Sequence, residues 1–179
     1  MASNLLPFRD YSEHDVINLF TWSGAVPRTK GCVVRVVAGF DNTTGVARLG
    51  DVGANHGNTV SERYGVHAKV AAATGSAHSP LGMTLYDVKE EDENGEKLIF
   101  NPRKAAEMEI ALSGQAVPVV TKGIFLYSGG SLGSAVAGSA LYTDTAGELT
   151  TTDSGSMPIV GRALGAEDSN GHILVRINL

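Results

Sequence analysis

Short runs of alternating apolar and polar residues, separated by glycine-rich turns, make up most of the chain. In the clearest run Ile173, Val175, Ile177 and Leu179 alternate with His172, Leu174, Arg176 and Asn178. Successive side chains of a strand point to opposite faces of the sheet, so this run predicts a strand with one apolar face. Similar runs predict strands at 33–37, 46–49, 66–70, 83–88, 97–100, 124–127, 140–142 and 159–164. The turn residues at 143–147 predict a hairpin turn.

Helical signals are few. Ser12 has the character of an N-cap, with the acidic Asp15 three positions later and apolar residues continuing to Phe20, so we expect one short helix there. The dipeptide Asn101-Pro102 can cap a further short helical turn through 103–106. The pattern as a whole predicts a mostly β protein.

Two stretches of the chain are nearly identical. Residues 23–31 read Ser-Gly-Ala-Val-Pro-Arg-Thr-Lys-Gly, and residues 113–123 read Ser-Gly-Gln-Ala-Val-Pro-Val-Val-Thr-Lys-Gly. Such a repeat favours duplication of a small domain. We therefore expect an all-β fold of two tandem small β-barrel or β-sandwich units related by the repeat. The expected parts are an extended N-terminal arm with a short helix at 1–22, a first β unit at 23–100, a connector at 101–112 and a second β unit at 113–179.

The composition fits a turn-rich β protein. The 179 residues include 22 glycines, 42% are hydrophobic and only 18% are charged. A net charge of −5 provides no sequence-wide basic field, so we expect no nucleic-acid partner. Since no apolar run approaches the roughly 20 residues of a membrane helix, we expect no membrane partner and synthesis in a cytoplasm.

Residues capable of chemistry do not fall into a catalytic or metal-binding pattern. The acidic run Glu90–Glu93, with Glu96 close by, lacks the spacing of a calcium loop, and the five histidines lack the spacing of a zinc site. Cys32 sits in an apolar run, and neither a nucleophile motif nor a phosphate-binding loop is present. We expect no catalytic activity, no cofactor and no metal.

Apolar and aromatic residues are frequent at the N-terminal end, before the first repeat. This segment either folds back on its own β body or reaches another chain. A protein without visible chemistry and with such an arm is suited to assembly. The candidate anchors for a subunit of such an assembly or for a neighbouring copy are Leu5, Leu6, Phe8, Tyr11, Phe20 and Trp22.

The second predicted unit resembles the small β domains of tailed-phage capsid decoration, or cement, proteins. The resemblance is carried by 121–124, 137–142, 145–149, 159–164 and 173–177, which combine a glycine-opened strand, a hairpin with a glycine turn, a Val-Gly-x-Ala strand and a closing strand. It implies a structural protein on the outer surface of an icosahedral head in the virion, often trimeric. Its partner would be the major capsid protein, whose subunit contacts it would stabilise.

Two other functions remain open from the residues alone. A virion or cell-surface adhesin could bind host glycans through the loops Asp51–Tyr64 or Ser128–Ser134. A hydrolase could assemble its site from residues distant in the sequence. Glycan binding would distinguish the first, and a pocket that joins His, Asp and Ser would distinguish the second.

Overall fold

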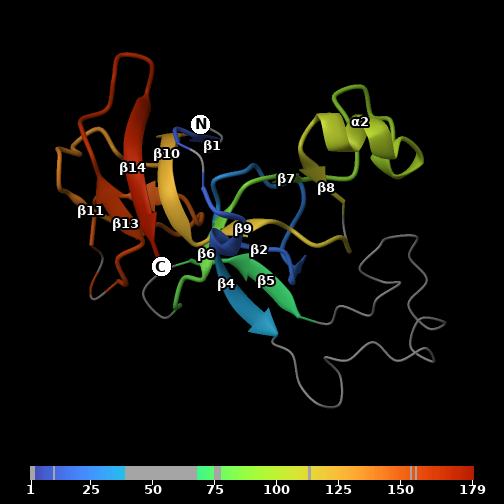
Figure 1. The fold of residues 1–179 in the computed structure, drawn as a ribbon, viewed down its shortest axis with the longest axis horizontal. Helices are drawn as coiled ribbons and strands as arrows, with labels where there is room; N and C mark the ends of the chain where they lie inside the picture. The colour runs from blue at the N-terminus through green and yellow to red at the C-terminus, as the bar shows by residue number, and fades with distance from the viewer. Residues whose placement is uncertain are drawn as a thin grey trace.

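The protein is mostly β with one short α-helix in the part that the computed structural model describes, and none of its sheets closes into a barrel (Figure 1). The described residues are 3–9, 11–38, 68–74, 78–112, 114–153, 155 and 157–179. The strand expected at 46–49, the start of the strand expected at 66–70 and the candidate loop Asp51–Tyr64 lie outside them.

The first sheet has six strands in the order β1-β10-β14-β13-β11-β12. Their bounds are β1 Asn4–Pro7, β10 Lys122–Ser128, β11 Ala140–Thr143, β12 Leu149–Thr150, β13 Gly161–Ala163 and β14 His172–Asn178. All neighbours pair antiparallel. The alternation predicted for the last strand is confirmed for Ile173, Val175 and Ile177, which are buried while Arg176 is exposed; Leu179, expected on the same apolar side, lies beyond the end of β14 and is 40% exposed.

The second sheet also has six strands, in the order β2-β9-β6-β4-β5-β3. Their bounds are β2 Val16–Ile17, β3 Thr21–Trp22, β4 Val33–Ala38, β5 Lys69–Ala72, β6 Gly82–Thr84 and β9 Val119–Val120. A third sheet pairs β7 Asp87–Val88 with β8 Ile110–Ala111 in parallel. All strands of the second and third sheets lie between β1 and β10 in the sequence. In chain order these two sheets are therefore nested between two strands of the first sheet.

Both faces of the second sheet are apolar. Val33, Met83 and Val120 join the main core, where they pack with Phe125, Val175 and other inward residues of the first sheet. Their neighbours Val34 and Val119 point the opposite way, into a second cluster that includes Trp22, Cys32 and Val88. Residues of both large sheets therefore contribute to the main core.

The N-terminal segment contributes strands to both large sheets and does not extend from the body as an arm. β1 is an edge strand of the first sheet, and β2 and β3 are the two edge strands of the second. The short helix expected from Ser12 is wrong beyond its first turn: Ser12 caps a 3₁₀ turn, Glu13–Asp15, and Val16 is already extended. The β-branched Val16 and Ile17 pair with β9 instead, because tertiary pairing outweighs a weak helical signal.

A small lobe projects from the body around the α-helix (Figure 1). It contains a 3₁₀ turn, Leu98–Phe100, and α2, Pro102–Glu107. The expected helical turn is confirmed, since the Asn101 side chain accepts the Lys104 backbone N–H at 3.3 Å and Pro102 opens the helix. The strand expected at 97–100 is wrong, because only Leu98 finds apolar neighbours there, among Ala105, Ile110 and Leu112.

Three hairpin turns share one construction, Asp-x-x-Gly-x, beginning at Asp92, Asp144 and Asp168. In each turn the aspartate Oδ1 accepts the backbone N–H groups two and four residues later, at 2.8 Å. The glycine at the fourth position has a φ of 77–80°, in the left-handed region that favours glycine. The turn expected at 143–147 is thus confirmed.

The two copies of the sequence repeat lead into strands of different sheets. Gly31 precedes β4 of the second sheet, and Gly123 lies at the start of β10 of the first. Both glycines have a positive φ, 84° and 153°. The duplication and the domain boundaries stay predictions.

Candidate docking surfaces

The six predicted anchor residues fall into separate environments. Leu5 is 1% exposed in the main core, and Trp22 is 9% exposed in the second cluster, with Phe20 packed against that cluster. The Tyr11 ring lies 5.9 Å from the ring of buried Phe125. Leu6 and Phe8 are 39% and 60% exposed, and Tyr11 remains 37% exposed despite its contact with Phe125. The structure therefore does not bring the six together as one surface.

A row of four leucines crosses the outer side of the first sheet. Leu6 pairs with Leu126, and Leu126 pairs with Leu174. Leu164 follows β13 and donates its backbone N–H to the Leu174 carbonyl at 2.8 Å. Cross-strand partners share a face, and the residues on either side of Leu126 and Leu174 point into the core, so the row faces away from it. None of the four leucines is buried.

Two arginines lie beside the leucine row. Arg162 and Arg176 are cross-strand partners on β13 and β14, both exposed. Arg162 Nη1 donates to the Gly138 carbonyl at 3.1 Å, and neither arginine forms an ion pair with a described residue. The strands β1, β10, β13 and β14 carry no acidic residue. We call these four leucines and two arginines the leucine face.

The leucine face is basic in an acidic protein. Like charges directly opposite on neighbouring strands destabilise a sheet unless a partner compensates them. A carboxylate from another molecule could bind both guanidinium groups.

The lobe at residues 89–109 has the opposite charge, with seven acidic and four basic residues. Phe100 is 85% exposed at its tip, and Ile99 beside it is also exposed. Backbone hydrogen bonds from Phe100 N–H to the Lys97 carbonyl and from Asn101 N–H to the Leu98 carbonyl fix this turn. We call residues 89–109 the acidic lobe.

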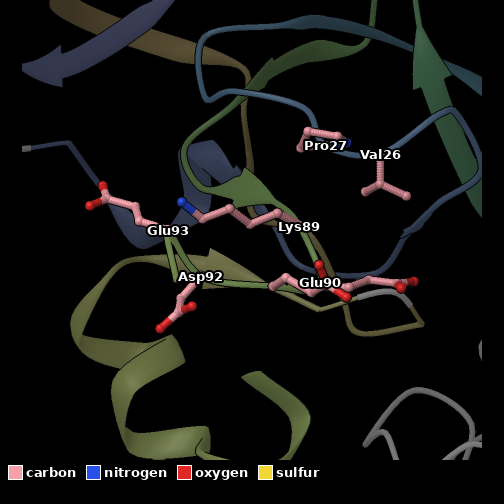
Figure 2. Close-up of a pocket in the computed structure, with 7 residues that line it drawn as sticks. Val26, Pro27, Lys89, Glu90, Asp92 and Glu93 are labelled. Atoms are coloured by element: carbon pink, nitrogen blue, oxygen red, sulfur yellow. The ribbon is translucent and has the colours of Figure 1, made fainter. Parts of the chain in front are cut away.

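The inner side of the acidic lobe is held by an ion-pair network. Lys104 Nζ donates to Asp92 Oδ2 and lies 3.5 Å from Glu96 Oε2. The hydrogen bond from Lys104 lowers the pKa of Asp92, and the same bond raises the pKa of Lys104. Figure 2 shows Asp92 turned toward α2.

The remaining acidic side chains of the run border an open hollow. Lys89 and the run Glu90–Glu93 line it together with Val26 and Pro27, and its volume is about 500 Å³ (Figure 2). Glu90, Glu91 and Glu93 are exposed, and none is in an ion pair with a described residue. The hollow therefore presents a net negative charge next to two apolar side chains.

A second hollow, of about 330 Å³, lies beside the N-terminal segment. Its lining is mostly aromatic and aliphatic, and it comprises Tyr11, Glu13, Val16, Asn18, Leu85, Tyr86, Ala116 and Pro118. Tyr11 and Tyr86 remain partly exposed at 37% each. We call it the aromatic hollow, and it is large enough for one apolar side chain.

Cys32 and Tyr127, two side chains with ionisable groups, are buried in the apolar clusters of the body. Burial raises the pKa of the Cys32 thiol, and burial likewise raises the pKa of Tyr127, whose hydroxyl accepts the Leu149 backbone N–H at 3.1 Å. No group of three or more His, Cys, Asp or Glu able to hold a metal ion occurs among the described residues. Within the same residues no helix is long and apolar enough to cross a membrane.

Part of the leucine face could be predicted from the sequence alone. The alternation on the last strand already placed Leu174 and Arg176 on the side away from the apolar face. That alternation does not show which strands lie beside the last strand, or in which register. Both are needed to align Leu6, Leu126 and Leu164 with Leu174. Comparison with family models, with curated proteins and with solved structures found no match.

Proposed function

We propose that this chain is a structural capsid decoration protein that binds the outer surface of an icosahedral phage head and stabilises contacts between major capsid subunits. One observation carries the proposal. Three separate surfaces of the described body expose apolar side chains: the leucine face, the acidic lobe and the aromatic hollow. Exposed apolar surfaces mark interaction sites, and several on one body suit a protein that contacts several neighbours at once.

The aromatic hollow is the proposed contact with the shell. It is formed by the N-terminal segment against Leu85, Tyr86 and Pro118, so its walls come from three distant parts of the chain. Both large sheets hold that segment in place through β1, β2 and β3. A pre-formed hollow can accept an apolar side chain of a capsid subunit without reorganising, and repetition over a lattice multiplies a modest affinity.

The test uses capsids of the encoding virus assembled without this protein. Purified chain should co-sediment with them to saturation and should raise the temperature at which they disrupt. Replacing Tyr86 by Ser should weaken binding about tenfold or more, because aromatic anchors dominate such contacts. Ile159→Ser is the matched control, since Ile159 is exposed outside the three surfaces.

Truncation of residues 1–20 is a poor test of the same idea. It would remove β1 and β2 together with the buried Leu5, so loss of binding would follow from loss of the fold. Absence of saturable capsid binding by the intact chain contradicts the proposal. Saturable glycan binding without capsid binding would instead favour an adhesin.

Several finer statements belong to the same proposal. A decoration protein would be made in the host cytoplasm and would then occupy the outside of the virion, as a trimer in the arrangement that the resemblance implies. Duplication of a small β unit remains our explanation for the repeat, supported by the position of its last glycine, since Gly31 comes just before β4 and Gly123 lies at the start of β10.

A further inference from the structure

We infer that the acidic lobe of one copy binds the leucine face of a second copy, so that copies join head to tail. This inference goes beyond capsid binding, because it concerns the purified chain alone. It is drawn from the surfaces that the fold leaves exposed at two different places.

Both surfaces expose apolar side chains. Phe100 ends a 3₁₀ turn and is 85% exposed, with the exposed Ile99 beside it. The leucine row places four apolar side chains on neighbouring strands, two of them exposed and two partly exposed. Packing of the Phe100 ring on that row would remove both from water, and buried apolar area drives association.

The charges of the two surfaces are opposite. Arg162 and Arg176 lie directly beside the leucine row and have no carboxylate partner among the described residues. Glu90 and Glu91 belong to the same hairpin as the Phe100 turn, since the Glu90 carbonyl accepts the Leu98 backbone N–H at 2.9 Å. The second copy's arginines would therefore meet glutamates when its leucines meet Phe100, and this pairing sets the orientation.

The placement of the two surfaces determines the kind of assembly. The leucine face is on the side of the first sheet that points away from the main core, whereas the lobe around α2 is a separate part of the body, away from that sheet (Figure 1). When two different patches of one chain pair between copies, the contact is head to tail, which generates rings or open chains rather than an isologous dimer.

The experiment measures self-association by sedimentation velocity over a range of concentrations. Either Phe100→Ser, or Arg162→Glu together with Arg176→Glu, should weaken association at least about tenfold. These side chains are exposed, so thermal unfolding at low concentration should stay near that of the natural chain and show that both variants fold. Lys69→Glu, an exposed charge reversal on β5, is the control and should leave association unchanged.

A mixture of the two variants provides the decisive measurement. The arginine variant keeps an intact lobe and the Phe100 variant keeps an intact leucine face, so together they should form a one-to-one complex at a concentration at which neither variant associates alone. Combining Glu90→Lys and Glu91→Lys with the two arginine reversals in one chain should restore association, because both charges are exchanged.

Three results would overturn the inference. They are a natural chain that stays monomeric up to about 1 mM, an association that neither variant weakens, and a mixture that fails to form the complex. Because no capsid is present, none of these results bears on shell binding, and failure of shell binding would leave this interface standing.

Discussion

Replacement of Leu5 by Ala tests whether the N-terminal segment is part of the folded body. Leu5 is 1% exposed and pairs with Tyr127 across β1 and β10. The backbone of Gly31 closes over it, since a Cβ on that glycine would lie 3.3 Å from the Leu5 Cβ. A free arm would have no such contacts, so the variant separates an integrated strand from an appendage.

The expected magnitude follows from the size of the side chain. Leu→Ala removes three carbons, at about 0.8 kcal/mol each when buried, or roughly 2.4 kcal/mol before any cavity is counted. Core Leu→Ala replacements cost about 2–5 kcal/mol in total, and an edge strand can shift to fill part of the space, so we expect about 2–3.5 kcal/mol. For a chain of this length the melting temperature should fall by roughly 5–12 °C.

The adjacent residue supplies the control. Leu6 lies on the same strand but faces outward at 39% exposure, so Leu6→Ala should cost less than about 1 kcal/mol. Urea and thermal unfolding, followed by circular dichroism at low protein concentration, measure both. Equal losses of stability for the two variants, or no loss for Leu5→Ala, would refute the placement of β1.

Three further variants test the turns and the core. Gly130→Ala should cost about 3 kcal/mol or more, because a Cβ there would lie 2.1 Å from a backbone oxygen, whereas Gly95→Ala, at a similar φ with nothing within 4 Å, should cost about 1–2 kcal/mol; chemical denaturation compares them. Tyr127→Phe should cost about 1–3 kcal/mol, because it leaves a buried backbone N–H without its acceptor; an unchanged denaturation midpoint would contradict this. The hydrogen bond from the His172 backbone N–H lowers the pKa of the Asp168 carboxyl below its ordinary value of 3.8. The stabilisation that the ionised carboxylate gives to the fold is therefore complete above pH 3.8, and it is lost as the pH falls through the lower pKa of the folded protein. Asp168→Asn should therefore flatten the acid limb of stability against pH, and an identical acid limb would count against the turn geometry.

Local sequence signals predicted the elements whose causes are local. The last strand, the turn at 143–147 and the helix after Asn101-Pro102 each follow from side-chain alternation, turn residues or a cap. Ser12 was also recognised as a cap. The helix expected after it failed at Val16, where pairing with β9 supplies hydrogen bonds that no nearby residue reveals.

Features that depend on distant pairing could not be predicted. Leu5 and Leu6 are adjacent in the sequence and equally apolar, yet one is buried and the other exposed, because β10 fixes which face each takes. The leucine face exists only through the register of four strands. In the acidic run, Asp92 differs from its neighbours by binding Lys104 across the lobe, a contact that the run of like charges conceals.

The nested order of the strands has a consequence for synthesis of the chain. Asn4 pairs with Ser128, so β1 leaves the ribosome long before its partner strand exists. Until then its two leucines have no sheet to join, while the second sheet, encoded between, can already assemble. Pairing β1 with β10 closes a long loop, which costs conformational entropy, and packing of the finished core offsets that cost. A strand that is translated well before its partner therefore docks late, and a chaperone that shields it would favour correct folding.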